Sequence, residues 1–193
     1  MDNEYTIDGV DPVGVTYLEP DLYVTDTTAR VVQRYNTETK AIIKIVEDEK
    51  VGYINQRTTR VLLPMMELDS IFVYRGAPEL YKLQVANKLN GPKYFDGFKI
   101  NDFAISDAGN HRVIRKIGNV ETIIGKKGSG VGELLNPEGI RFANNKLYVA
   151  DSGNNRVQIF SSEGEYISAL ADVYMEKYPS FLQMERIYFF SIN

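Results

Sequence analysis

An internal repeat constrains this chain more than any other feature of its sequence. Residues 103–117 read FAISDAGNHRVIRKI, and residues 147–160 read LYVADSGNNRVQIF. The two segments carry Asp, Asn and Arg in register 44 residues apart, at Asp107 and Asp151, Asn110 and Asn154, and Arg112 and Arg156. A fixed period of this length indicates a repeat architecture, in which each unit buries its apolar faces against its neighbours.

Two further copies of the repeat match less closely. Residues 22–35 read LYVTDTTARVVQRY, and we align Asp26 and Arg30 with the Asp and Arg of the clear copies, in a turn one residue shorter. Arg30 lies 82 residues before Arg112, about two periods, so another copy is expected in between. We assign it to residues 71–83, IFVYRGAPELYKL, which keep the apolar, turn, apolar order and lack both the Asp and the Arg.

Each unit divides into four short apolar runs separated by turn residues. In the last unit these runs are 138–142, 146–150, 156–161 and 165–170. They are rich in β-branched and aromatic residues and are bounded by Gly, Asn, Asp and Ser, which predicts four antiparallel strands per unit. A repeat of about 40 to 45 residues with four strands is typical of a β-propeller blade.

These segments resemble the NHL repeat, in a form common in bacterial proteins. The resemblance rests on NPEGI at 136–140, on KLYVADSGNNRVQIF at 146–160 and on the glycine-rich linker 125–133. It is close over residues 93–170 and weaker elsewhere. It implies an all-β propeller that serves as a rigid scaffold for binding proteins or RNA. Distant relatives with similar blades are lyases or hydrolases that use a metal ion in the axial channel.

We therefore expect one propeller domain over residues 1–193, with blades at about 11–50, 51–92, 93–133 and 134–172. Residues 173–193 are expected to form a closing strand or to begin a further blade. NHL propellers usually have six blades and roughly 260 residues. Three alternatives stay open: a small closed propeller, an open arc that another chain completes, and a fragment of a longer propeller.

The recurrent Asp, Asn and Arg residues are expected to be structural. Asp and Asn accept backbone N–H bonds in tight turns, and an Arg that opens the next strand can reach back to the Asp carboxylate or across to the neighbouring blade. The alternative is that acidic side chains repeated around the axis bind a cation. The set comprises Asp26, Arg30, Asp107, Asn110, Arg112, Asp151, Asn154 and Arg156.

Composition leaves few routes to catalysis. The chain has no cysteine and one histidine, His111, which stands where the sister turn has Asn155. Thiolate chemistry and multi-histidine metal sites are thereby excluded, and any metal site needs oxygen ligands. The segment GKKGSGVG at 125–132 lacks the spacing of a phosphate-binding loop, so we assign it to a connection between blades.

A group of aromatic residues near the end of the chain is a candidate interface. The chain has 13 tyrosines and 9 phenylalanines, most of them expected in the core. Six fall outside a complete repeat and either pack as a closing strand or form an exposed apolar patch: Tyr174, Tyr178, Phe181, Tyr188, Phe189 and Phe190.

Charge and hydropathy set the expectations about partners. A net charge of -4 argues against nucleic acid, although Arg112, Arg115, Lys116, Lys126 and Lys127 form one dense basic stretch. The chain carries no signal-peptide pattern and no apolar run long enough to span a membrane, so a cytoplasmic location is the default expectation.

Together these observations favour a non-catalytic binding scaffold that mediates protein–protein interaction or self-association and needs no cofactor. The alternative is a lyase or hydrolase that depends on a divalent cation, with Ca²⁺ as the candidate ion, and acts in the axial channel.

Overall fold

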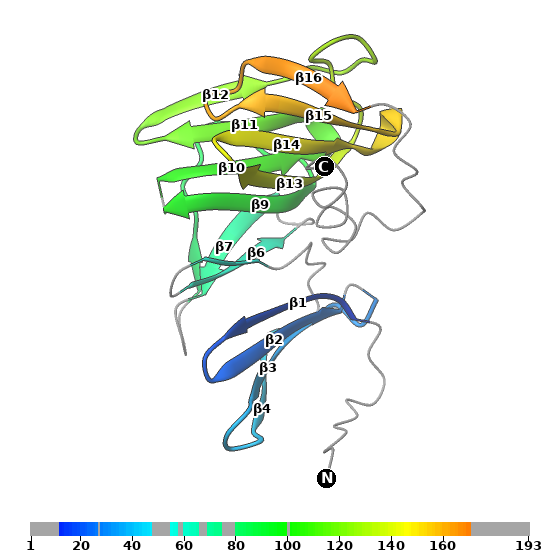
Figure 1. The fold of residues 1–193 in the computed structure, drawn as a ribbon. Coiled ribbons are helices and arrows are strands. Elements are labelled where there is room, and N and C mark those ends of the chain that lie inside the picture. Colours follow the sequence, from blue (N-terminus) through cyan, green and yellow to red (C-terminus); the bar gives the residue numbers. More distant parts are fainter. Residues whose placement is uncertain are drawn as a thin grey trace, which may run out of the picture.

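The computed structural model describes residues 12–26, 28–47, 55–57, 60–65, 69–74, 80–99 and 101–170. Within these ranges the chain forms β-strands and two short 3₁₀ turns, η1 (Ala108–Asn110) and η2 (Ser152–Asn154). The strands make four antiparallel sheets of four strands each (Figure 1). This confirms the all-β architecture of four-stranded units that the repeat predicts.

The strands of each sheet follow their order in the chain, so each connection inside a sheet joins neighbouring antiparallel strands. Sheet 1 contains β1 (Pro12–Leu18), β2 (Asp21–Asp26), β3 (Val31–Asn36) and β4 (Ile42–Glu47). Sheet 2 contains β5 (Asn55–Arg57), β6 (Arg60–Met65), β7 (Ser70–Tyr74) and β8 (Leu80–Lys82). Sheet 3 contains β9 (Pro92–Lys99), β10 (Asp102–Asp107), β11 (Arg112–Ile117) and β12 (Val120–Ile124). Sheet 4 contains β13 (Pro137–Ala143), β14 (Lys146–Asp151), β15 (Arg156–Ser161) and β16 (Tyr166–Leu170).

The four sheets follow one another in chain order, with sheet 1 at one end of the array and sheet 4 at the other (Figure 1). Neighbouring sheets meet mainly through their first strands: β1 contacts β5, β5 contacts β9, and β9 contacts β13. Blades that radiate from a common axis bring their innermost strands together in this way. The first strand of each sheet is therefore the innermost one.

Apolar cores fill the junctions between successive sheets. Sheets 1 and 2 meet through Tyr23, Val32, Val46 and Tyr74. Sheets 2 and 3 meet through Ile71, Val73, Phe95, Phe103, Ile105 and Ile114. Sheets 3 and 4 meet through Tyr94, Ala104, Val113, Ile140, Phe142, Leu147 and Val149. Because side chains alternate along a strand, neighbours such as Tyr94 and Phe95 serve different junctions, and sheet 3 is apolar on both faces.

The structural register shifts the alignment of Arg30 by one residue. β2 ends at Asp26 and pairs with Val31, the same step as from Asp107 to Arg112. Val31 therefore takes the arginine position, and the turn is not shortened. Arg30 instead matches His111, because both residues adopt a left-handed backbone conformation, with φ of 58° and 54°.

The register also shifts the alignment of residues 71–83. Their first run belongs to β7, which is the third strand of sheet 2 rather than the second. The connection equivalent to the Asp and Arg turn runs from Met65 to Ser70. Asp69 holds the left-handed position there, with φ of 46°. Short apolar runs of similar composition do not reveal which strand of a blade they form, so the sequence alone gave no basis for the distinction.

Residues 173–193, for which a closing strand or a further blade is expected, lie outside the described residues. The same holds for Tyr174, Tyr178, Phe181, Tyr188, Phe189 and Phe190.

Candidate functional site

The Asp and Arg of sheet 3 close the connection between β10 and β11. Arg112 Nε donates to Asp107 Oδ2 at 2.7 Å, and Asn110 Nδ2 donates to the same oxygen at 2.8 Å. The guanidinium also reaches the linker before sheet 3, where Arg112 Nη2 donates to the Lys88 carbonyl at 2.8 Å. The carboxylate of Asp107 is fully buried, so these charge-assisted bonds offset its desolvation.

Sheet 4 repeats this arrangement. Arg156 Nε and Asn154 Nδ2 donate to Asp151 Oδ2 at 2.8 and 2.9 Å. Arg156 Nη2 donates to the carbonyls of Gly130 and Glu133, both at 2.8 Å. The arginine thus makes both contacts that the sequence offered as alternatives, one to its own turn and one to the linker from the neighbouring blade.

The buried Asp also holds the linker through its second oxygen. The Leu135 N–H donates to Asp151 Oδ1 at 2.7 Å, and the Leu135 carbonyl accepts from the Gly153 N–H at 2.8 Å. In sheet 3 the same bonds join Asn90 to Asp107 at 2.6 Å and to Gly109 at 3.0 Å. Each linker is therefore fixed to the blade that follows it.

The residue in the left-handed position fixes the linker to the blade that precedes it. The Gly91 N–H donates to Asp69 Oδ1 at 2.7 Å, and the Asn136 N–H donates to His111 Nδ1 at 3.0 Å. His111 is thus a linker contact between sheets 3 and 4. We call the bonds that hold residues 90–91 from both sides the first linker lock, and the bonds that hold residues 135–136 the second linker lock.

The turn of sheet 1 is built differently in the described residues. Asp26 Oδ1 accepts from the backbone N–H groups of Thr28 and Ala29, at 2.8 and 2.7 Å, within its own turn. This is the turn chemistry expected from the sequence. Arg30 occupies the left-handed position that precedes β3.

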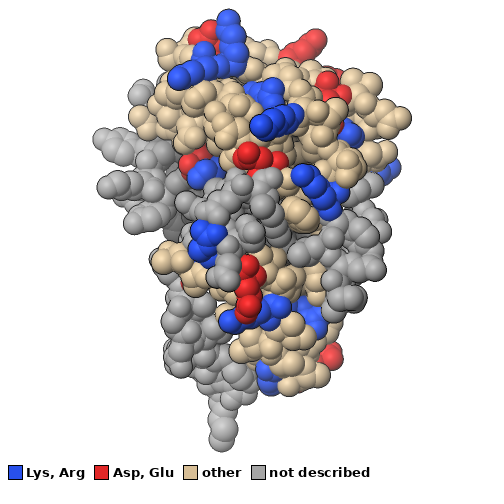
Figure 2. Space-filling model, turned by 180° about the vertical axis from the view of Figure 1, so that it is seen from behind, with Lys and Arg blue, Asp and Glu red and all other residues tan. Residues whose placement is uncertain are grey.

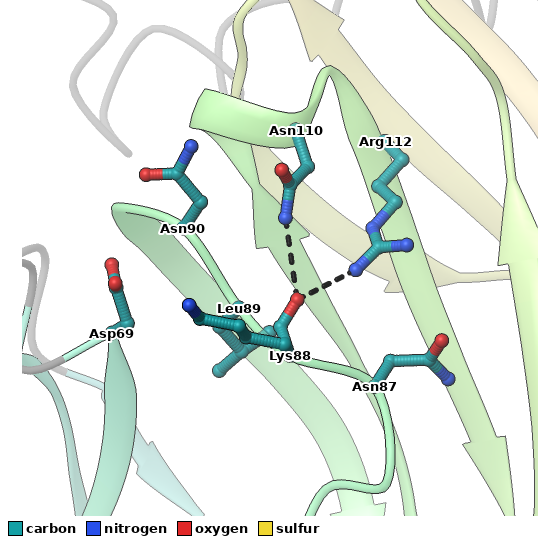
Figure 3. A pocket seen from close by; sticks show the side chains of 7 residues that line it. All are labelled: Asp69, Asn87, Lys88, Leu89, Asn90, Asn110 and Arg112. Atoms are coloured by element: carbon teal, nitrogen blue, oxygen red, sulfur yellow. Dashed lines mark hydrogen bonds between the residues drawn. The ribbon is translucent and has the colours of Figure 1, made fainter.

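A polar cavity of about 660 Å³ lies where the first linker lock joins sheets 2 and 3. Its walls come from the β6–β7 connection, the linker before β9 and the η1–β11 segment (Figure 3): Asp69, Asn87, Lys88, Leu89, Asn90, Asn110 and Arg112. The Lys88 ammonium makes no ion pair with a described residue, and the Asn90 side chain makes no hydrogen bond with one. Both side chains are exposed, so this cavity offers free polar groups on a fixed backbone.

Glu121 supports the linker that forms one wall of this cavity. Its carboxylate accepts from the Ala86 N–H at 2.9 Å, from Asn87 Nδ2 at 2.9 Å and from Lys116 Nζ at 3.0 Å. Burial alone raises the pKa of Glu121, but these hydrogen bonds outweigh it and lower the pKa to about 2. The ionised carboxylate therefore anchors the linker at neutral pH.

The dense basic stretch of the sequence is largely used inside the fold. Arg115 is 3% exposed and bridges sheets 3 and 4, since its Nε donates to the Ser162 carbonyl at 2.7 Å and its guanidinium lies 4.7 Å from the Phe142 ring. Lys116 pairs with Glu121 as above. On the face shown in Figure 2, Lys and Arg are interspersed with Asp and Glu.

Two further buried polar residues, Asp96 and Gln158, contact the neighbouring sheet or linker, and the repeat pattern did not identify either of them as a contact residue. Asp96 is fully buried and accepts from the Phe142 N–H of sheet 4 at 2.7 Å. Gln158 is fully buried, and its Oε1 accepts from the Gly132 N–H at 3.0 Å. Their partners lie 46 and 26 residues away in the chain, so only the packing of blades reveals them.

Among the described residues, no three or more His, Asp or Glu side chains gather where they would hold a metal ion. Within the same part of the chain, no helix has the length and apolar character that a membrane crossing requires.

Comparison with known proteins agrees with this architecture. The model of the NHL repeat matches residues 134–160, which include the second linker lock, β13, β14 and most of β15. This part of the chain is therefore an NHL repeat. The chain is 53% identical over 45 residues to protein lin-41 of Caenorhabditis elegans, a match that covers 23% of this chain and 4% of lin-41.

Solved structures of β-propellers share the fold of this chain. A catalytically inactive virginiamycin B lyase from Staphylococcus aureus, with quinupristin, matches 86% of this chain and 57% of its own with a TM-score of 0.67 at 16% identity. A luciferin-regenerating enzyme matches 82% of this chain and 59% of its own, with a TM-score of 0.56 and 15% identity. The chain thus spans little more than half the length of these propellers, and at such identities the likeness shows the fold alone.

Proposed function

We propose that this NHL-repeat chain is a non-catalytic binding scaffold that holds a segment of a partner protein in the cavity between sheets 2 and 3. The observation that carries the proposal is the combination of a fixed backbone with free polar groups. The first linker lock fixes Asn90 and Gly91 to both sheets, while the Lys88 ammonium and the Asn90 carboxamide point to no described partner. Because the linker backbone is already fixed, a ligand has to order these two side chains but not the segment that carries them.

The charge of the cavity selects the chemistry of the partner. Arg112 is already paired with Asp107, so Lys88 is the cation of the cavity lining that makes no ion pair with a described residue, and Asp69 is the carboxylate of the lining. The asparagine side chains add hydrogen-bond donors and acceptors suited to a peptide backbone. We therefore expect a polar segment that carries an acidic side chain, which pairs with Lys88.

Selection from a random peptide library, displayed on phage and panned against the purified chain, tests this proposal. Enriched peptides should contain Asp or Glu, and their binding should fall about tenfold or more in Lys88→Glu. Lys127→Glu is the matched control, because Lys127 is also exposed but lies in the next linker. Peptides that bind both variants as well as the wild type would contradict the proposed site.

The cation-dependent lyase or hydrolase is the alternative function, and metal removal separates it from the proposal. Peptide binding by the scaffold should be unchanged after dialysis against EDTA, since no described ligand cluster takes part in it. Binding that disappears with EDTA and returns with Ca²⁺ would favour the alternative.

A further inference from the structure

We propose that the segment bound in the cavity between sheets 2 and 3 is a glycine-rich turn with an acidic residue two positions before it. This inference rests on the proposed function and specifies the ligand of that site. The fold repeats the donors of this cavity in sheet 4, where residues of the chain itself occupy the equivalent place.

The two linker locks place Lys88 and Glu133 at equivalent positions. Each stands two residues before the linker amide that the buried Asp holds. Both backbone carbonyls accept a hydrogen bond of 2.8 Å from Nη2 of the arginine that opens the third strand, Arg112 in sheet 3 and Arg156 in sheet 4. The surroundings of Glu133 therefore show what the surroundings of Lys88 can bind.

In sheet 4 a glycine-rich turn fills the space in front of the arginine. Asn154 Nδ2, Arg156 Nη1 and Arg156 Nη2 donate to three successive carbonyls of this turn, at 2.9, 3.0 and 2.8 Å. The carbonyls belong, in that order, to Gly128, Ser129 and Gly130. The two donor side chains thus recognise the backbone of the turn rather than its side chains.

The linker before sheet 3 is shorter and leaves the same donors without such a turn. It spans residues 83–91, whereas the linker before sheet 4 spans residues 125–136. Arg112 Nη1 makes no hydrogen bond with a described residue. Asn110 Nδ2 reaches the Lys88 carbonyl, at 3.3 Å (Figure 3). Because both side chains line the cavity, it occupies the place that the turn takes in sheet 4.

The charge beside the turn is reversed between the two blades. In sheet 4 the Glu133 carboxylate lies 3.4 Å from the ammonium of Lys126, two residues before the turn. In sheet 3 the equivalent side chain is Lys88, which is exposed and makes no ion pair with a described residue. A turn that docks in the same way therefore needs Asp or Glu where the linker has Lys126.

The expected ligand is an acidic residue, any residue, and then Gly-Ser-Gly. A Cβ on Gly128 would collide with the Glu133 carboxylate, so the turn lies directly against the side chain at this position. The chain's own turn is already bound in sheet 4, so the ligand comes from another protein. Asn110 and Arg112 then bind its backbone, and Lys88 selects its charge.

Titration of the isotope-labelled whole chain with short peptides, followed by NMR, tests the proposal. The probe is residues 125–131 with Lys126→Glu, GEKGSGV, acetylated and amidated so that its ends carry no charge. It should shift the side-chain signals of Asn110 and Arg112. It should also bind about fivefold or more tightly than the unaltered GKKGSGV, because an attraction to Lys88 replaces a repulsion. The matched control, GSGVGKE, has the same composition but places the acidic residue after the turn, and it should leave these signals unmoved.

Lys88→Glu gives the sharpest comparison, because it restores in sheet 3 the charges of sheet 4. In this variant the preference should reverse, so that GKKGSGV binds about fivefold or more tightly than GEKGSGV. Lys127→Glu makes the same charge change outside the cavity and should keep the wild-type preference. A preference that does not reverse, or GEKGSGV binding that moves neither Asn110 nor Arg112, would overturn the proposal.

Peptides selected from the random library separate this inference from the proposed function. Acidic peptides that depend on Lys88 but lack the Gly-Ser-Gly run, together with no binding of GEKGSGV, would show that the cavity binds a different segment. The inference would then be wrong and the proposed function would stand. A library without any ligand that depends on Lys88, together with no binding of GEKGSGV, would overturn both.

Discussion

Replacing Asp151 with asparagine removes the acceptor on which the second linker lock depends. The carboxylate is fully buried and accepts from Arg156, Asn154, Gln158 and the Leu135 N–H, at 2.8, 2.9, 3.0 and 2.7 Å. An asparagine of the same shape has one acceptor oxygen, so at least one of these donors faces an NH₂ group and loses its partner. Hydrogen bonds to charged groups contribute about 1.5 to 3 kcal/mol each, and breaking a buried pair costs about 3 to 5 kcal/mol. We expect Asp151→Asn to lower the free energy of unfolding by about 3 kcal/mol.

Urea denaturation followed by far-ultraviolet circular dichroism measures this loss. At typical m-values it corresponds to a fall of about 1 to 2 M in the unfolding midpoint. Glu165→Gln is the control, because the Glu165 side chain is exposed and its variant should change the free energy by less than about 0.5 kcal/mol. In a double-mutant cycle, Arg156→Gln should cost much less in the Asp151→Asn background than in the wild type. A loss below about 1 kcal/mol for Asp151→Asn, or fully additive effects, would refute this reasoning.

Three further changes test other parts of the fold, each by urea denaturation. Gly153→Ala should destabilise by about 1 to 3 kcal/mol, because its Cβ would lie 2.6 Å from the Leu135 carbonyl oxygen. Glu121→Gln should cost up to about 3 kcal/mol at neutral pH. Since the folded pKa of Glu121 is lowered to about 2 from 4.5, this contribution is full above pH 4.5 and fades as pH falls toward 2, where wild type and variant should converge. Arg115→Lys should cost about 2 kcal/mol, because lysine cannot reproduce the fork of bonds that joins sheets 3 and 4.

Gly130→Ala separates a steric effect at Gly153 from a general cost of losing glycine. The Cβ of alanine at position 130 would meet only the end of the flexible Glu133 side chain, at 3.0 Å, so stability should change by less than about 0.5 kcal/mol.

For Glu121, a stability difference between wild type and Glu121→Gln that stayed constant from neutral to acid pH would show that the carboxylate charge contributes nothing.

The repeat made the blades predictable, because spacing and turn chemistry are local properties of the sequence. Asp107 and Arg112 are recognisable as a pair, since both stand in one connection and recur 44 residues later. Arg30 misled the alignment because it is the same residue type at a neighbouring position. What the turns share is a left-handed backbone, and side-chain identity reports that conformation only weakly for residues other than Gly and Asn.

Apart from the reach of Arg156 to the preceding linker, the contacts between blades were not predictable, because they depend on packing between distant segments. Nothing in the sequence shows that His111 accepts from Asn136, or that the Asp oxygens hold linker amides. Arg115 illustrates the limit most clearly. In the sequence it belongs to a basic stretch that suggests a charged surface, whereas in the fold it is buried between two sheets.

Hydrogen exchange of the linker amides tests most directly whether the two linker locks fix the face that carries the candidate site. We predict that the N–H groups of Asn90, Gly91, Leu135 and Asn136 exchange at least about 100-fold more slowly than that of the exposed Lys127, although all lie in connections between blades. The slow exchange of Leu135 should disappear in Asp151→Asn. Linker amides that exchange as fast as Lys127 in the wild type would contradict the account, because the site would then lack its fixed backbone.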